Sequence, residues 1–140
     1  MIVSDFIATY EKAPTLNPAS LVDQIEGFVE PSFHFTQLKE FTLAADDMIA
    51  YWLNVNVKTY RSYRDGKADL KPDVIEHLVM LTSFARHGVA VFGDGQTFGQ
   101  WLHTDNFMLG QRRPADLLNT NSGVRLVDDR LTGMEYGDNA

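Results

Sequence analysis

The residues able to do acid, base or metal chemistry are scattered through this 140-residue chain. The chain has four histidines, His34, His77, His87 and His103. They lack the i, i+4 spacing and the carboxylate neighbours that a zinc site on a helix would show. We therefore expect surface or core histidines. The sequence contains no cysteine, which excludes disulfides, thiolate catalysis and cysteine-based zinc sites. No metal or cofactor is expected.

Two acidic pairs and a group of glycines also resemble chemical motifs. Adjacent positions on a helix point in different directions, so we interpret Asp46-Asp47 and Asp128-Asp129 as helix-start or solvent-facing residues. A helix stop explains Gly93, Gly95 and Gly99 better than a nucleotide-binding loop, because they follow an expected helix rather than a strand. Because no nucleophile, base and oxyanion donor can be assembled, we predict that the chain is not an enzyme.

The segment from Asp46 to Asp65 satisfies the packing rules of a DNA-binding helix-turn-helix. Ala50 supplies the small residue where the two helices cross, and Asn54 tolerates the left-handed backbone of the turn. Apolar positions would bury the inner faces: Ile49, Leu53, Val55, Tyr60 and Tyr63. Polar side chains of the second helix and its flanks would face a major groove, and these are the expected DNA contacts: Asn56, Lys58, Thr59, Arg61, Ser62, Arg64 and Lys67.

The expected DNA contacts fall into two groups. Lys58 and Arg61 are the leading candidates for base edges or phosphates, while Arg64 and Lys67 are expected at the DNA backbone. The net charge of −7 argues against indiscriminate nucleic-acid coating, yet residues 57–71 hold five lysines or arginines against two aspartates. This asymmetry suits a dimer that contacts DNA through one face. The alternative is a helix-turn-helix used only for packing or dimerisation.

Size and hydrophobicity bound the remaining possibilities. A chain of 140 residues with 44% hydrophobic content can form one ordinary core. No secretion signal or membrane-spanning run is evident, so we expect a cytoplasmic protein with no membrane partner.

The spacing of apolar residues is helical throughout, and no segment shows sustained period-two alternation, so we predict an all-α fold. The longest helix is expected over residues 72–92, because Pro72 suits a first helical position. Shorter helices are expected on both sides of it. Their expected N-caps are Ser20, Thr42, Thr97, and Asn121 or Ser122.

The second half of the chain resembles the C-terminal module of the MbcA/ParS/Xre antitoxins. The resemblance rests on Val91-Phe92-Gly93-Asp94, Trp101-Leu102, Asn106, Leu109-Gly110, Pro114, Leu117-Leu118, Thr120, Gly123 and the run from Leu131 to Gly137. It extends over Leu21 to Gly137 and implies an Xre-like helix-turn-helix domain over 21–90 and a small α-helical toxin-binding domain over 91–140. Residues 1–20 precede the resemblance, and their prolines and polar residues predict a loop-rich lead-in.

This resemblance implies a function. The chain would be the antitoxin of a type II toxin–antitoxin system, a homodimer that binds a RES-domain toxin encoded by the adjacent gene. That toxin would attack NAD, by degradation or by ADP-ribosyl transfer. The antitoxin would cover the toxin's active site with its C-terminal segment and repress its own operon by binding operator DNA. The expected toxin-binding residues are Trp101, Leu109, Leu131, Met134, Glu135, Tyr136 and Gly137.

Elementary chemistry makes this assignment reasonable. A toxin cleft that handles nucleotide phosphates is expected to be electropositive, and the acidic side chains near the C-terminus would complement it: Asp128, Asp129, Glu135 and Asp138. Leu131, Met134 and Tyr136 would supply apolar anchors. Trp52 is left open as a dimer contact, and Trp101 as either buried between the modules or in contact with the toxin. The alternative function is a plain transcriptional regulator that uses the C-terminal module for dimerisation.

Overall fold

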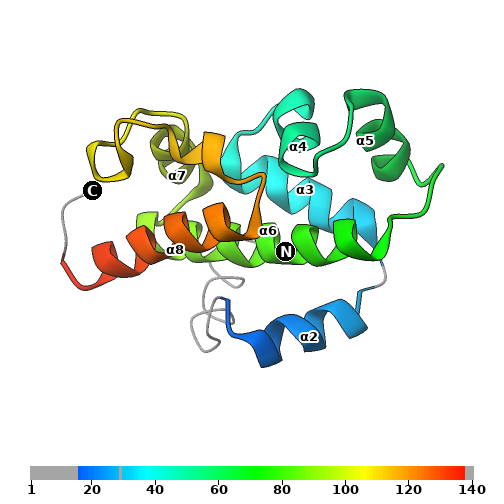
Figure 1. Cartoon of the computed structure of the whole chain (residues 1–140), viewed down its shortest axis with the longest axis horizontal. Coiled ribbons are helices and arrows are strands. Elements are labelled where there is room, and N and C mark those ends of the chain that lie inside the picture. Colours follow the sequence, from blue (N-terminus) through cyan, green and yellow to red (C-terminus); the bar gives the residue numbers. More distant parts are fainter. Residues whose placement is uncertain (1–15, 29, 138–140) are drawn as a thin grey trace.

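The computed structural model of the chain describes residues 16–28 and 30–137, and this part is all-α, as predicted (Figure 1). Its helices are α2 (Pro18–Glu26), α3 (Pro31–Thr42), α4 (Asp46–Trp52), α5 (Val57–Arg64), α6 (Pro72–Phe92), α7 (Gly95–Leu102), the short 3-10 helices η1 (Phe107–Leu109) and η2 (Pro114–Leu117), and α8 (Asn121–Glu135). None of these helices is long and apolar enough to cross a membrane.

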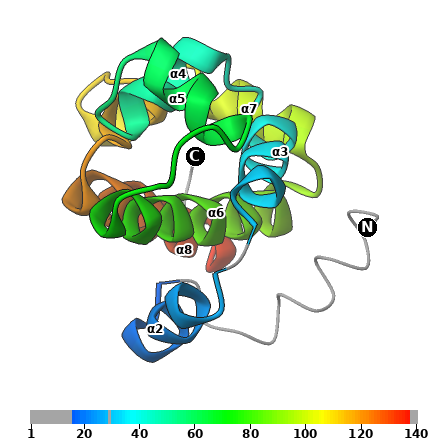
Figure 2. The ribbon, with the colours of Figure 1, turned by 90° about the vertical axis from the view of Figure 1, so that its right-hand side faces the viewer.

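Helix α6 is the centre of the molecule. Figures 1 and 2 show α3, α4, α5 and α7 on one side of it, α2 on the other, and α8 running alongside. Pro72 occupies its first turn, as predicted, and Gly93 ends it with a φ of 94°. Because neighbours cover α6 on several sides, apolar and polar residues alike are buried along it, including His77 and His87.

The starts of three helices differ from expectation. The cap of α2 is Asn17, whose side chain accepts from the Ser20 N–H at 3.2 Å. Asp94 accepts from the Thr97 N–H at 2.7 Å, and Thr120 accepts from the Gly123 N–H at 3.0 Å. The predicted caps Ser20, Thr97, Asn121 and Ser122 therefore lie inside their helices, because an earlier oxygen satisfies the free N–H groups.

Thr42 is likewise not the cap of α4. That position belongs to Ala45, which has no side-chain oxygen. The buried Thr42 hydroxyl instead donates to the Leu38 carbonyl and accepts from the Ala44 N–H, so it closes the end of α3.

The two helices around the predicted turn pack as expected. Ala50 is buried, and Asn54 adopts a left-handed φ of 59°. The side chains of Ile49, Leu53, Tyr60 and Tyr63 are buried, while Val55 is partly buried. The apolar positions that the sequence predicts to face inward are therefore buried or partly buried.

Hydrogen bonds fasten α4 and its turn to the segment that precedes α8. The side chains of Tyr51, Trp52 and Asn54 donate to the carbonyls of Asp116, Ala115 and Asn119 at 2.7, 2.8 and 2.8 Å. Trp52 is fully buried, so its indole belongs to the chain's own core and is no dimer contact. The boundary expected near residue 91 falls in the last turn of α6, which both expected domains share.

Of the expected lead-in, residues 1–15 lie outside the described residues, and α2 begins at Pro18, before that lead-in ends. Helix α2 packs against α6, and within α2 Leu21 is buried and Ile25 is partly buried against the core. The Ser83 hydroxyl of α6 donates to the Gln24 side chain of α2 at 3.1 Å.

Candidate functional sites

The predicted DNA-contacting residues gather on and beside α5. Asn56 caps this helix, and its side chain accepts from the Thr59 N–H at 2.8 Å. Lys58 and Lys67 are exposed and form no ion pair within the described residues, whereas Thr59 and Ser62 are partly buried. Lys58 and Lys67 are thus available to a phosphate.

Both arginines of α5 are engaged by Asp46 at the start of α4. Arg61 donates from Nε to Asp46 Oδ2 at 3.1 Å, and Arg64 donates from Nη1 to the same oxygen at 3.2 Å. The Lys39 ammonium contacts the other carboxylate oxygen. Hydrogen bonding to Lys39 is the main cause that lowers the pKa of Asp46, despite partial desolvation. Asp46 therefore holds three cations beside the predicted DNA face.

The two arginines differ in what remains free. Arg64 also donates from Nε to Asp65 at 2.9 Å, so two carboxylates share its charge. Arg61 uses Nε alone among the described contacts, and its side chain is 54% exposed. A planar guanidinium with free terminal nitrogens can bind a phosphate or a guanine edge in bidentate fashion. Arg61 is thus the better placed of the two for recognition.

The predicted toxin-binding residues split into a buried and an exposed group. Leu109 and Leu131 are buried in the chain's own core. Trp101 and Met134 are partly buried, while Glu135 and Gly137 are exposed, and Tyr136 is 86% exposed. Leu131 therefore cannot serve as an apolar anchor in this conformation. Among the apolar residues of the C-terminal segment, Tyr136 is the one exposed enough to do so.

A histidine fixes the last two turns of α8. His87 of α6 lies between two carboxylates of α8, with Nδ1 at 2.7 Å from Asp128 Oδ1 and Nε2 in contact with Glu135 Oε1. Burial disfavours the charged ring, but the two carboxylates outweigh it and raise the pKa of His87. Burial also raises the pKa of Asp128, against the opposing effect of His87.

Asp128 consequently does not offer its charge to a partner, contrary to the expectation that it complements an electropositive cleft. It is buried against His87, and its carboxylate is used inside the chain. Glu135 is also paired with His87, although its side chain remains partly open to solvent. Within the described residues no group of three histidine or acidic side chains could hold a metal ion.

Trp101 belongs to an aromatic cluster between α6 and α7. Its ring centroid lies 5.5 Å from that of Phe92 and 6.2 Å from that of Phe98. Gly88 makes this packing possible, because a Cβ there would lie only 2.1 Å from the Phe98 ring. The indole Nε1 of Trp101 is buried and has no hydrogen-bond partner among the described residues.

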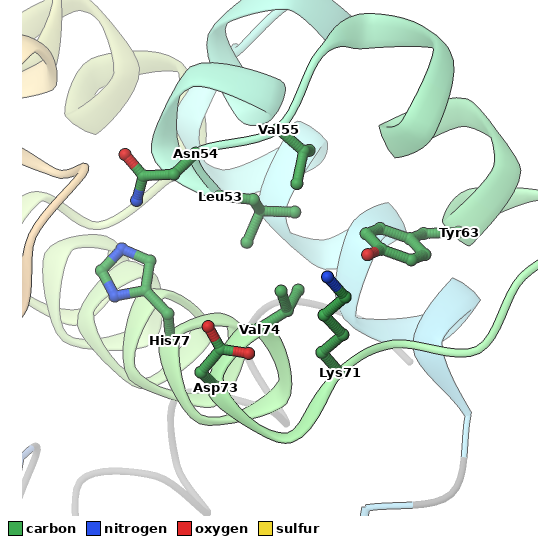
Figure 3. Close-up of a pocket in the computed structure, with 8 residues that line it drawn as sticks. All are labelled: Leu53, Asn54, Val55, Tyr63, Lys71, Asp73, Val74 and His77. Atoms are coloured by element: carbon green, nitrogen blue, oxygen red, sulfur yellow. The ribbon is translucent and has the colours of Figure 1, made fainter.

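A pocket of about 200 Å³ lies between the turn after α4, the end of α5 and the start of α6. Figure 3 shows Leu53, Val55 and Val74 around it, with the Lys71 side chain extending toward Tyr63. Two of the polar side chains that line it are already paired, because Asn54 donates to Asn119 and His77 contacts Leu118 and Asn121. Lys71 and Asp73 also line the pocket and form no ion pair within the described residues.

One exposed apolar pair was missed in the sequence. Phe107 and Met108 of η1 are 79% and 52% exposed. Two adjacent apolar residues in a loop give no sign in the sequence of whether they are buried or exposed, because composition does not show which side chains face solvent.

Comparison with known proteins defines the class of this chain. Residues 87–137 match the antitoxin Xre/MbcA/ParS C-terminal toxin-binding domain. A probable mycobacterial cidal antitoxin of Mycobacterium tuberculosis is 34% identical over 115 residues, which cover 80% of this chain and 91% of that relative. An all-α chain with these matches is an antitoxin of a toxin–antitoxin system, a binding protein rather than an enzyme. It belongs to the Xre/MbcA/ParS antitoxin family.

Proposed function

We propose that this antitoxin neutralises a RES-domain toxin that acts on NAD and that is encoded by the adjacent gene. The C-terminal end of α8 and the residues after it would cover the toxin's active site. The observation that carries this proposal is Tyr136, which stands 86% exposed at the end of the toxin-binding domain. Exposed aromatic side chains of this kind supply much of the binding free energy of protein interfaces.

The helix end that carries Tyr136 is held in place by contacts with α6. His87 binds Asp128 and Glu135, which lie about two turns apart on α8, and so holds the helix against α6 up to the residue before Tyr136. A side chain presented from an ordered helix end loses little conformational entropy on binding. The contacts proposed for the toxin are accordingly Met134, Tyr136 and Gly137, with Glu135 at their edge.

Neutralisation is tested by co-expression of the two neighbouring genes. The antitoxin should restore growth and co-purify with the toxin, and Tyr136→Ala should weaken toxin binding about tenfold or more. Truncation before Leu131 is not a suitable test, because Leu131 is buried and its loss would damage the core. A matched control is Leu126→Ala, which removes an exposed apolar side chain elsewhere on α8.

We further propose that the antitoxin acts as a homodimer in the cytoplasm and represses its own operon through α5. Lys58, Arg61 and Lys67 support this proposal, since Lys58 and Lys67 are free of ion pairs in the described part of the chain and Arg61 keeps free terminal nitrogens. A two-fold symmetric dimer would place two copies of α5 in successive major grooves of an operator.

A gel-shift titration against the operon's own promoter tests repression. Arg61→Ala should weaken binding about tenfold, whereas Arg64→Ala should weaken it less, because Arg64 is shared between two carboxylates. Equal losses for the two variants would contradict the division of roles between these arginines. Promoter binding by neither the parent chain nor its toxin complex would remove the DNA role altogether.

A further inference from the structure

The most exposed large apolar side chains of the described residues, besides Tyr136, lie together on η1. Phe107 is 79% exposed and its neighbour Met108 is 52% exposed. Burial of large apolar side chains stabilises a fold, so the exposure of both side chains leaves part of that stabilisation unused. Exposed apolar groups of this size mark interaction sites when they gather in one place.

The turn that carries them is held rigidly. Buried Asn106 accepts the Met108 N–H on its side-chain oxygen at 2.9 Å and accepts the Gln111 N–H on its carbonyl at 2.9 Å. Its own N–H donates to the Arg112 carbonyl at 3.1 Å, which closes the base of the loop. Buried Leu109 anchors the turn to the core. A loop ordered in this way binds with little loss of conformational freedom.

The backbone after η1 also holds the two apolar side chains at the tip of the loop. Gly110 and Gln111 both have positive φ values, 69° and 66°, and so reverse the chain directly after η1. For a glutamine this conformation is uncommon, and the surrounding hydrogen bonds stabilise it. The reversal presents Phe107 and Met108 at the tip of the loop rather than against the core.

From this geometry we propose that Phe107 and Met108 are a second contact with the toxin, separate from the C-terminal segment, and that they fill an apolar pocket on the toxin surface. The proposal rests on the proposed function. Both residues lie within residues 87–137, the toxin-binding domain. Figure 1 shows the loop that contains them (yellow) at the same end of the molecule as the end of α8 (red).

A second copy of this chain is a less suitable partner than the toxin for Phe107 and Met108. A closed dimer needs a self-complementary surface of about 800 Å² from each partner, and two side chains on a protruding turn supply only a small part of it. Two pockets flank the start of α6, one beside Val74 and one beside Leu70, and Figure 1 places that helix end opposite the loop. A contact between loop and pocket would join copies head to tail, which gives rings or open chains.

The double variant Phe107→Ser/Met108→Ser tests the proposal in the full-length antitoxin. Calorimetric titration with the adjacent-gene toxin, rendered inactive by an active-site substitution, should show about tenfold weaker binding or more. The matched control is Val22→Ser on α2, which removes a side chain of comparable exposure, 51%, outside the toxin-binding domain. The control should bind like the parent.

The outcomes separate this inference from the proposed function. If the parent chain does not bind the toxin, the proposed function fails. If the parent binds and the double variant binds within about twofold of it, the second contact is overturned. Loss of self-association by light scattering with unchanged toxin affinity also overturns it, and identifies a second copy as the partner. Phe107→Leu, which keeps an apolar side chain, should retain most of the toxin affinity.

Discussion

The indole Nε1 of Trp52 donates to the carbonyl of Ala115 at 2.8 Å, across 63 residues of sequence. This bond joins the helix that precedes the predicted DNA-facing helix to the segment that precedes α8. With the parallel bonds from Tyr51 and Asn54, it makes one packed body of the two parts that the sequence suggested as separate domains. A toxin held at the end of α8 and DNA held at α5 would therefore contact the same body.

Trp52→Phe should destabilise the fold by about 1 to 3 kcal/mol, because it leaves the buried Ala115 carbonyl without its donor. Tyr51→Phe removes a similar bond at an exposed position, where water replaces the lost donor, and should cost less than about 1 kcal/mol. Urea unfolding of both variants measures the difference. Equal losses of unfolding free energy in the two variants would show that the buried hydrogen bond stabilises the fold no more than the exposed one.

His34 should make the protein sensitive to acid. Burial, with a smaller effect of Arg86, lowers the pKa of His34 from 6.5 to about 4. As the pH falls below 6.5 the unfolded chain binds a proton that the folded chain does not, so the free energy of unfolding decreases until the folded pKa is reached. Because the His34 ring is only partly buried, solvent screening keeps its contribution below the roughly 3 kcal/mol that the full pKa difference would give. His34→Gln should lose less stability than the parent between neutral pH and about pH 4 in urea titrations.

His87 should give the opposite dependence. Although burial lowers it, the hydrogen bonds and charges of Asp128 and Glu135 give a net increase in the pKa of His87. Its stabilising effect is therefore complete below the unfolded value of 6.5 and is lost as the pH rises through the folded pKa. The parent should become less stable at alkaline pH, and His87→Gln should show a flatter profile. A parent that gains stability over this range relative to His87→Gln would contradict the assignment.

Asp46→Asn should raise the affinity for promoter DNA. The substitution releases Arg61 and Arg64 from a carboxylate that competes with phosphate and that repels it. Asp47→Asn is the matched control, because it changes the net charge equally at the next residue, which forms no ion pair within the described part. Gel-shift titrations at one salt concentration should show a larger gain for Asp46→Asn. A smaller or negative effect would mean that Asp46 orients Arg61 for binding.

The sequence predicted the helices well because their signals are local. Pro72 and the apolar period after it located α6, and Asn54 located the turn. The positions of helix caps were less accurate, since several oxygens near each helix start could satisfy the same N–H groups, as with Asn17 and Ser20.

The candidate sites depended on contacts between distant residues, which the sequence does not contain. Leu131 and Tyr136 are both apolar residues near the C-terminus, yet the first is buried against the core and the second is exposed. Asp128 looked like a surface acid until the structure placed His87 beside it. The pairing of Arg61 with Asp46 is equally invisible in the sequence, because the two residues come from different helices.

Neutralisation of the toxin by the C-terminal end of α8 can be measured with the single substitution Tyr136→Ala. Growth of cells that co-express the adjacent-gene toxin with either antitoxin variant is measured beside calorimetric titration of the purified pair. We predict that Tyr136→Ala fails to restore growth and binds about tenfold more weakly or worse, while Leu126→Ala behaves like the parent. Full rescue and unchanged affinity for Tyr136→Ala would show that this end of α8 does not neutralise the toxin.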